Sequence, residues 1–142
     1  MRPGESDALR WIDIDWPNQK IRVRQTRYRG QFNDPKTKAS TRDIDILPPV
    51  LAVLQAQQAV TEGTSPFVFC SQAGTSLDYT LTNKRVWYPT LERLGIATRT
   101  PYQTRHTFAT LMLAAGENPE WIARQMGHAL CIALTMQTWR RG

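Results

Sequence analysis

Alternating apolar and polar residues in the first third of the chain predict a small antiparallel sheet. The alternation has the period of a half-buried β-strand and occurs three times, with a turn at Pro17-Asn18 after its first occurrence. The apolar positions are Ile12, Ile14 and Trp16, then Ile21 and Val23, and lastly Ile44 and Ile46. We therefore expect three antiparallel strands between residues 11 and 47, with one face of the sheet in solvent.

From residue 48 onward, apolar residues recur at helical spacing instead. Pro48-Pro49 opens a first helix that ends near Gly63. A second helix is expected to begin at a Thr80 cap and to kink near Tyr88, because Pro89 lies inside it. The fold class that follows is α+β, with a small three-stranded antiparallel sheet packed on a helical bundle.

Another helix is predicted to begin at residue 100. Thr100 and Gln103 have the spacing of a capping box, Pro101 would take the first helical position, and Gly116 would end the helix. Its apolar face would comprise Phe108, Leu111, Met112 and Ala115. This helix and the one after it contain the residues with the clearest chemical pattern.

These last two helices carry a candidate anion site. Tyr102 and Arg105 are three residues apart and so share a face near a helix N-terminus, where free N–H groups and positive partial charge suit an anion. The final helix begins at Asn118-Pro119 and ends at Gly127. His128 follows directly, so its imidazole can turn toward the same site.

A basic segment separates the second and third predicted strands. Residues 22–42 hold seven lysine and arginine side chains, with Tyr28 and Phe32 among them. Two interpretations remain open: a solvated hairpin face, or a flexible basic loop that lies along phosphates. The candidate phosphate contacts in this segment are Arg22, Arg24, Arg27, Arg29, Lys38 and Arg42.

The composition is that of an ordinary soluble domain with an excess of positive charge. The 142 residues suffice for one core, with 41% hydrophobic and 21% charged residues. The net charge of +6 suggests a polyanionic partner. No apolar run reaches the length of a membrane span, and Cys70 and Cys131 lack metal-ligand spacing, which fits a reducing cytoplasm.

The sequence around the anion site resembles a known family. PYQTRHTFATLML, followed by Gly127-His128, is similar to the second conserved box of the tyrosine recombinases, the phage-integrase family. Tyr102 stands where a histidine is commoner in that box, whereas Arg105 and His106 match it. Adjacent helical residues point about 100° apart. We therefore interpret His106 as a structural residue that is packed or hydrogen-bonded in the core.

Two shorter stretches extend the resemblance. Arg2-Pro3-Gly4-Glu5 is similar to the family's first box, and on that match Arg2 is the first catalytic arginine. Pro35–Ser40 resembles the hairpin whose lysine reaches the scissile phosphate, and we favour Lys36 over Lys38 for that role. The resemblance implies a single catalytic domain over residues 1–142, a fragment at its N-terminus and without the family's core-binding domain.

The resemblance implies site-specific DNA recombination and integration by strand breakage and rejoining through a phosphotyrosine intermediate. The implied partners are double-stranded DNA and further copies of the chain on DNA, without metal, cofactor or membrane. The resemblance places DNA contacts, in addition to those in the basic segment, at Lys84 and Arg85 near the start of the second predicted helix, and a solvated helix face is the alternative interpretation of these two residues. The family's nucleophilic tyrosine follows shortly after Gly-His, but no tyrosine follows His128 here. The chain therefore also fits a noncatalytic DNA-binding remnant of an integrase.

The residue types in the matching positions suit phosphoryl transfer without a metal ion. Arg2 and Arg105 can each grip nonbridging oxygens with a planar, permanently charged fork. Lys36 would donate a proton to the leaving 5′-oxygen, and His128 would hydrogen-bond the phosphate or the nucleophile. Tyr102 is neutral at pH 7, so it can donate a hydrogen bond to phosphate but cannot accept a proton as an imidazole could.

Overall fold

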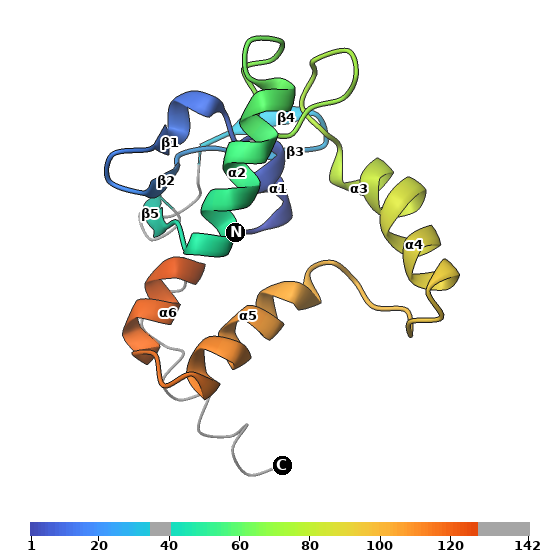
Figure 1. Cartoon of the computed structure of the whole chain (residues 1–142). Coiled ribbons are helices and arrows are strands. Elements are labelled where there is room, and N and C mark those ends of the chain that lie inside the picture. Colours follow the sequence, from blue (N-terminus) through green and yellow to red (C-terminus); the bar gives the residue numbers. More distant parts are fainter. Residues whose placement is uncertain (35–40, 128–142) are drawn as a thin grey trace.

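The computed structural model describes residues 1–34 and 41–127 of the chain. A sheet-containing body precedes a set of helices, as expected for the α+β class (Figure 1). In Figure 1, α2 (Pro48–Thr61) lies beside the sheet and in front of α1 (Pro3–Asp7), and α5 and α6 lie below the body. None of the helices in the described part of the chain has both the length and the hydrophobicity of a membrane span.

The three-stranded sheet is present and antiparallel. Its strands are β1 (Ile14–Asp15), β2 (Lys20–Val23) and β5 (Arg42–Asp45), in the order β1-β2-β5. Ile14 pairs with Ile21, and Ile21 pairs in turn with Ile44. The alternation therefore predicted the strands and also which residues share one face of the sheet, because residues two apart point to the same side.

The first strand is shorter than its alternation suggested. Residues Trp11–Asp13 form a 3₁₀ turn, and Ile12 is 77% exposed instead of lying in a strand. The Asp13 carboxylate accepts the backbone N–H of Arg10 at 3.1 Å, which closes this turn. The expectation of a strand from residue 11 was wrong because a local side-chain cap competes with strand pairing there.

The basic segment contains a second, two-stranded hairpin. It consists of β3 (Thr26–Tyr28) and β4 (Gln31–Asn33), joined by a turn in which Arg29 and Gly30 have φ of 50° and 80°. Two consecutive positive φ values match the twist of tight hairpins. The described part of the segment thus follows the hairpin interpretation, whereas residues 35–40 lie outside the described residues.

The main hydrophobic core lies between the sheet, α2 and the chain that follows it. Backbone bonds join Trp11 N–H to the carbonyl of Pro66 and Val68 N–H to that of Leu9, each at 3.0 Å. The buried residues of this core are Leu9, Trp11, Ile14, Ile21, Ile46, Leu54 and Val68. Burial of Leu54 fixes α2 on the body, as the apolar spacing of that helix predicted.

A helical segment after residue 78 extends to one side of the sheet (Figure 1). It comprises α3 (Tyr79–Thr82), a π-helical turn at Asn83–Trp87, and α4 (Tyr88–Arg93). The distortion expected from Pro89 is present, with the N–H of Tyr88 donating to the Asn83 carbonyl five residues earlier. The cap is Asp78 and not Thr80, since the Asp78 carboxylate accepts the N–H groups of Thr80 and Leu81.

The last two described helices are α5 (Gln103–Ala114) and α6 (Pro119–Met126). Thr100 N–H donates to Gln103 Oε1 at 2.9 Å, which is one half of the expected capping box, but Pro101 lies in a turn before the helix. The second core, between these helices, consists of Ala109, Ile122 and Met126, with Phe108, Met112, Leu113 and Trp121 packed against it. Leu111 is 59% exposed and takes no part in it.

The Asp45 carboxylate is one of the groups that hold helix α6 on the sheet. Asp45 Oδ2, on β5, accepts Trp121 Nε1 at 2.7 Å and Gln125 Nε2 at 3.0 Å. Gln125 Oε1 in turn accepts the backbone N–H of Asp45 at 2.8 Å. As the sequence predicted, α6 begins at an Asn118 cap and ends at Gly127, whose φ is 65°. These bonds fix where the C-terminal end of α6 lies.

Candidate phosphate-binding site

Arginine side chains from three parts of the chain meet at the C-terminal end of α6. Arg42 Nε donates to the Gln125 carbonyl at 3.0 Å, and Arg2 Nη2 donates to the Gly127 carbonyl at 3.2 Å. Arg105 Nη2 donates to the carbonyl between them, that of Met126. The negative end of the helix dipole favours this gathering of cations. The structure thus brings Arg2 and Arg105, which are far apart in sequence, to one place.

Arg105 has hydrogen-bonding capacity that the described residues do not use. The residue is 6% exposed, and its Nε and Nη1 are buried without a hydrogen-bond partner in the described part of the chain. Burial, and then repulsion by the charge of Arg2, hold the pKa of Arg105 below its usual value. A buried cation with unused donors lowers stability unless an anion accepts from it. The site is therefore suited to bind an anion.

Glu5 is a site residue whose role the sequence did not reveal. It is 5% exposed, and its carboxylate accepts hydrogen bonds from both Nη atoms of Arg42, at 2.9 and 3.0 Å. It also accepts the backbone N–H of Arg2 at 2.6 Å. Burial raises the pKa of Glu5, but the bonds from Arg42 and Arg2 outweigh it, and the net pKa is lowered. The sequence feature that could have indicated this role is the position of Glu5, an acidic residue three positions after Arg2.

Arg42 does not lie where an exposed DNA contact was expected. Its side chain is only 8% exposed, and its guanidinium faces the buried Glu5 and the Gln125 carbonyl. Arg27, another candidate contact, has a side chain that is 19% exposed and donates to the Leu77 carbonyl at 2.8 Å. Both arginines hold parts of the chain together in this structure, because each donates to a backbone carbonyl far away in sequence.

The remaining basic candidates that the structure describes are at the surface. Arg22 pairs with Asp15, and Arg24 Nη2 lies 2.6 Å from Asp43 Oδ1. Arg29 lies over the Tyr28 ring, 5.3 Å from its centre. The exposed candidates on the π-helical turn are Lys84 and Arg85. Lys36, Lys38 and His128 lie outside the described residues, so their expected positions are not tested.

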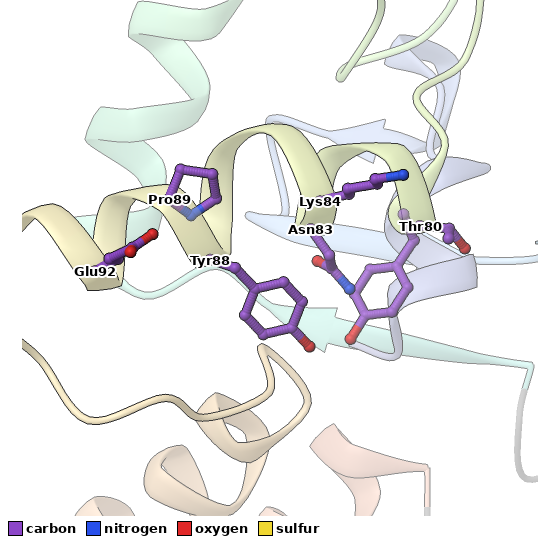
Figure 2. Close-up of a pocket in the computed structure, with 7 residues that line it drawn as sticks. Thr80, Asn83, Lys84, Tyr88, Pro89 and Glu92 are labelled. Carbon is purple, nitrogen blue, oxygen red and sulfur yellow. The ribbon is translucent and has the colours of Figure 1, made fainter.

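Lys84 lines an open groove on the α3–α4 segment. The groove has a volume of about 550 Å³, and Tyr79, Asn83 and Tyr88 also line it. Figure 2 shows the side chains of Asn83 and Tyr88 projecting from the same side of this segment. The groove combines an ammonium group with aromatic faces, and such surfaces are suited to nucleic acid.

Tyr102 and His106 lie together at the start of α5, outside the core. Tyr102 is 40% exposed, and its ring meets the His106 imidazole edge-on with centres 5.7 Å apart. His106 is exposed and lines an open groove of about 730 Å³ with Arg99. The interpretation of His106 as a core residue was therefore wrong. Its neighbour Arg105 faces inward, so the next helical position points to solvent.

Comparison with known proteins identifies the family of this chain. The model of the phage integrase family matches residues 1–137. The chain belongs to the phage integrase family. Prophage integrase IntR of Escherichia coli strain K12 is 33% identical to it, over 90% of this chain and 37% of IntR. The resemblance seen in the two sequence boxes is thereby confirmed.

Solved structures of integrases show the same fold. The Tn1549 transposon integrase, in complex with a circular intermediate DNA, superposes with a TM-score of 0.78 at 27% identity, over 96% of this chain and 49% of that chain. The XerA recombinase superposes with a TM-score of 0.74 at 25% identity, over 95% of this chain and 46% of that one. The expected α+β catalytic-domain fold is confirmed. The chain spans only 39% and 37% of the first two curated relatives it matches.

Proposed function

We propose that this integrase domain binds the scissile phosphate of double-stranded DNA in site-specific recombination, in which strands are broken and rejoined. The observation that carries the proposal is the buried guanidinium of Arg105, with two unused donors beside Arg2. Two planar cations side by side match the two nonbridging oxygens of a phosphodiester. Binding that phosphate would supply the acceptors that Arg105 lacks.

The same residues can stabilise the transition state of phosphoryl transfer. Negative charge grows on the nonbridging oxygens as the phosphorus becomes pentavalent, and Arg2 and Arg105 would neutralise it. Tyr102, at the exposed start of α5, would donate a hydrogen bond to the phosphate. Lys36 would protonate the leaving 5′-oxygen and His128 would bind the phosphate or the nucleophile; the family resemblance supports both roles.

The exposed basic residues would hold the rest of the duplex through its phosphates. The proposed contacts are Arg22, Arg24, Arg29, Lys38, Lys84 and Arg85. We keep Arg27 and Arg42 out of this set, because their side chains are turned toward protein acceptors. Assembly of several copies on DNA is part of this proposal because the family resemblance implies it. A cytoplasmic location is supported by Cys70 and Cys131, which lack metal-ligand spacing and fit a reducing compartment.

A second candidate function is DNA binding without cleavage. It is favoured by one observation: none of the residues 128–142 is a tyrosine, although the family's nucleophile is a tyrosine that follows Gly-His. The alcohols in that stretch, Thr135 and Thr138, are much weaker nucleophiles than a phenol. On this candidate the phosphate site is retained and the covalent step is not available to the chain.

Both candidates require the phosphate site to bind DNA, and a variant of Arg105 tests this. Fluorescence anisotropy would compare wild type, Arg105→Met and the control Arg10→Met on two unrelated duplexes. Arg10→Met likewise removes one positive charge, and Arg10, which pairs with Asp13, lies outside the proposed site. We expect wild-type dissociation constants of about 10⁻⁴ to 10⁻⁶ M that weaken steeply with salt.

Arg105→Met should weaken binding about tenfold on both duplexes, while the control stays close to wild type. The variant should remain folded, because an apolar isostere of a buried, partly unsatisfied cation is often neutral or stabilising. Equal affinities of Arg105→Met and Arg10→Met would contradict the proposed phosphate site. Affinity that does not change between low and high salt would contradict DNA binding altogether.

A further inference from the structure

Arg42 joins three parts of the chain that form the phosphate site. It is the first residue of β5, its two Nη atoms bind the Glu5 carboxylate of α1, and its Nε binds the Gln125 carbonyl of α6. These partners are 37 and 83 residues away in sequence. All three guanidinium nitrogen atoms thus donate to groups within the protein, although Arg42 begins a strand next to the basic segment.

The guanidinium of Arg42 also packs directly against Gly127. A Cβ placed on Gly127 would lie 2.6 Å from Arg42 Nη1 and 2.7 Å from Cζ. Gly127 ends α6 with φ of 65°, and its carbonyl accepts Arg2 Nη2. The position of Arg42 therefore sets where the Gly127 carbonyl lies, and this carbonyl is one of the groups that orient the Arg2 side chain.

Arg42 further controls how Glu5 interacts with Arg2. Glu5 holds Arg2 closely through the backbone N–H, at 2.6 Å, whereas Arg2 Nη1 lies 3.5 Å from the Glu5 carboxylate. With Arg42 in place, the buried carboxylate has a two-pronged partner of its own. Without Arg42, the Arg2 guanidinium, whose Nη1 already lies within ion-pair distance of Glu5, would be drawn closer to this carboxylate, because a buried carboxylate needs a partner.

We propose that Arg42 is a positioning residue of the phosphate site, which keeps the Arg2 guanidinium directed at the end of α6 and only loosely paired with Glu5. This inference rests on the proposed function, since it assumes that Arg2 and Arg105 hold a phosphate. Arg42 itself makes no contact with DNA on this account. Its effect on binding passes through Arg2, and that dependence can be measured.

A double-mutant cycle in DNA binding tests the dependence. Arg42→Met should weaken duplex binding about tenfold, whereas the charge-matched control Arg10→Met should leave it near wild type. In an Arg2→Met background, Arg42→Met should cause no further loss, because the residue it positions is already absent. Arg42→Lys, which keeps the charge but not the two-pronged geometry, should fall between Arg42→Met and wild type. Additive losses, or equal losses in Arg42→Met and Arg10→Met, would overturn the proposal.

Hydrogen exchange at the Gly127 amide, measured without DNA, separates this proposal from the proposed function. Arg42→Met should speed this exchange at least tenfold relative to Arg10→Met, because the end of α6 loses its anchor. If Arg42→Met does not fold, Arg42→Lys takes its place with a smaller increase. Unchanged exchange would overturn the positioning role. Failure of Arg105→Met to affect DNA binding, together with faster exchange in Arg42→Met, would reject the proposed function and leave the structural link in place.

Discussion

The close approach of Gly127 to Arg42 makes this glycine hard to replace. Gly127→Ala should lower the free energy of unfolding by about 1–2 kcal/mol for the left-handed backbone, with a further loss from the displaced guanidinium. Gly116→Ala is the matched control, because Gly116 has φ of 85° and no atom within 4 Å of its Cβ position. Urea denaturation of the two variants measures the difference. Equal losses of unfolding free energy in the two variants would show that the contact between Gly127 and Arg42 does not contribute to stability.

Burial of the Asp7 carboxylate should make the free energy of unfolding depend on pH. Its carboxylate accepts the Tyr79 N–H at 2.9 Å, which ties α1 to the start of α3. Burial, and then the neighbouring charge of Asp78, raise its pKa from 3.8 to about 6, although the Tyr79 bond and Arg27 act in the opposite direction. The folded chain therefore binds more protons than the unfolded chain between these two values.

The stability that Asp7 contributes should be present at low pH and lost as the pH rises through about 6. Asp7→Asn keeps an acceptor for Tyr79 and removes the charge. It should raise the free energy of unfolding at neutral pH by about 1 kcal/mol, after allowance for solvent screening, and have little effect near pH 4. Urea midpoints across this range measure the effect. A stabilisation that does not depend on pH would contradict this account.

At the scale of elements, docking of α6 on the sheet depends on Asp45. Its carboxylate receives hydrogen bonds from Lys20, from Trp121 and from Gln125, and these bonds, with that of Lys20 foremost, lower its pKa. Asp45→Ala should cost about 2 kcal/mol, near 1 kcal/mol for each lost bond to α6. The same substitution at Asp43, which makes an exposed pair with Arg24, should cost less than about 0.5 kcal/mol.

Hydrogen exchange along α6 would show whether the loss in Asp45→Ala is local. The backbone amides of α6 from Glu120 to Met126 should exchange faster in this variant, while those of β2 change little, because only the attachment of the helix is broken. The same exchange pattern in Asp43→Ala and Asp45→Ala would mean that other contacts hold the helix. Such a result would indicate that α6 is held mainly by the contacts of its apolar face.

At the scale of the whole molecule, this chain should form no covalent complex with DNA. Its tyrosines are Tyr28, Tyr79, Tyr88 and Tyr102, and the one beside the phosphate site is Tyr102, immediately before α5. On the proposed function Tyr102 donates a hydrogen bond to the phosphate, and none of residues 128–142 supplies a phenol to attack it. Incubation with a nicked suicide substrate should therefore give no protein–DNA band in denaturing gels.

A band that persists under denaturing conditions would refute the noncatalytic candidate. Comparison with Tyr102→Phe would then identify the nucleophile: loss of the band in this variant would show that Tyr102 attacks the phosphate, contrary to its proposed role. Tyr28→Phe is the matched control, because Tyr28 is an exposed tyrosine on β3. An intact band in both variants would direct the search to another hydroxyl.

Sequence patterns predicted much of the local structure. Alternation around Ile21 and Ile44 predicted two paired strands, and Asn118-Pro119 with Gly127 predicted both ends of α6. The distortion before Pro89 followed from its missing N–H. These features depend on backbone geometry and on neighbours a few residues away, so a single sequence contains the information needed to recognise them.

Only the family resemblance predicted that Arg2 and Arg105 lie together. The groups to which the two arginines donate became known only from the tertiary structure. Burial of Glu5 with Arg42, and the approach of Gly127 to that pair, join residues far apart in the chain. A basic residue that opens a strand looks the same in sequence whether it faces solvent or a buried acid. Long-range packing decides between these positions, because the cost of burying one charge depends on which opposite charge the fold brings to it.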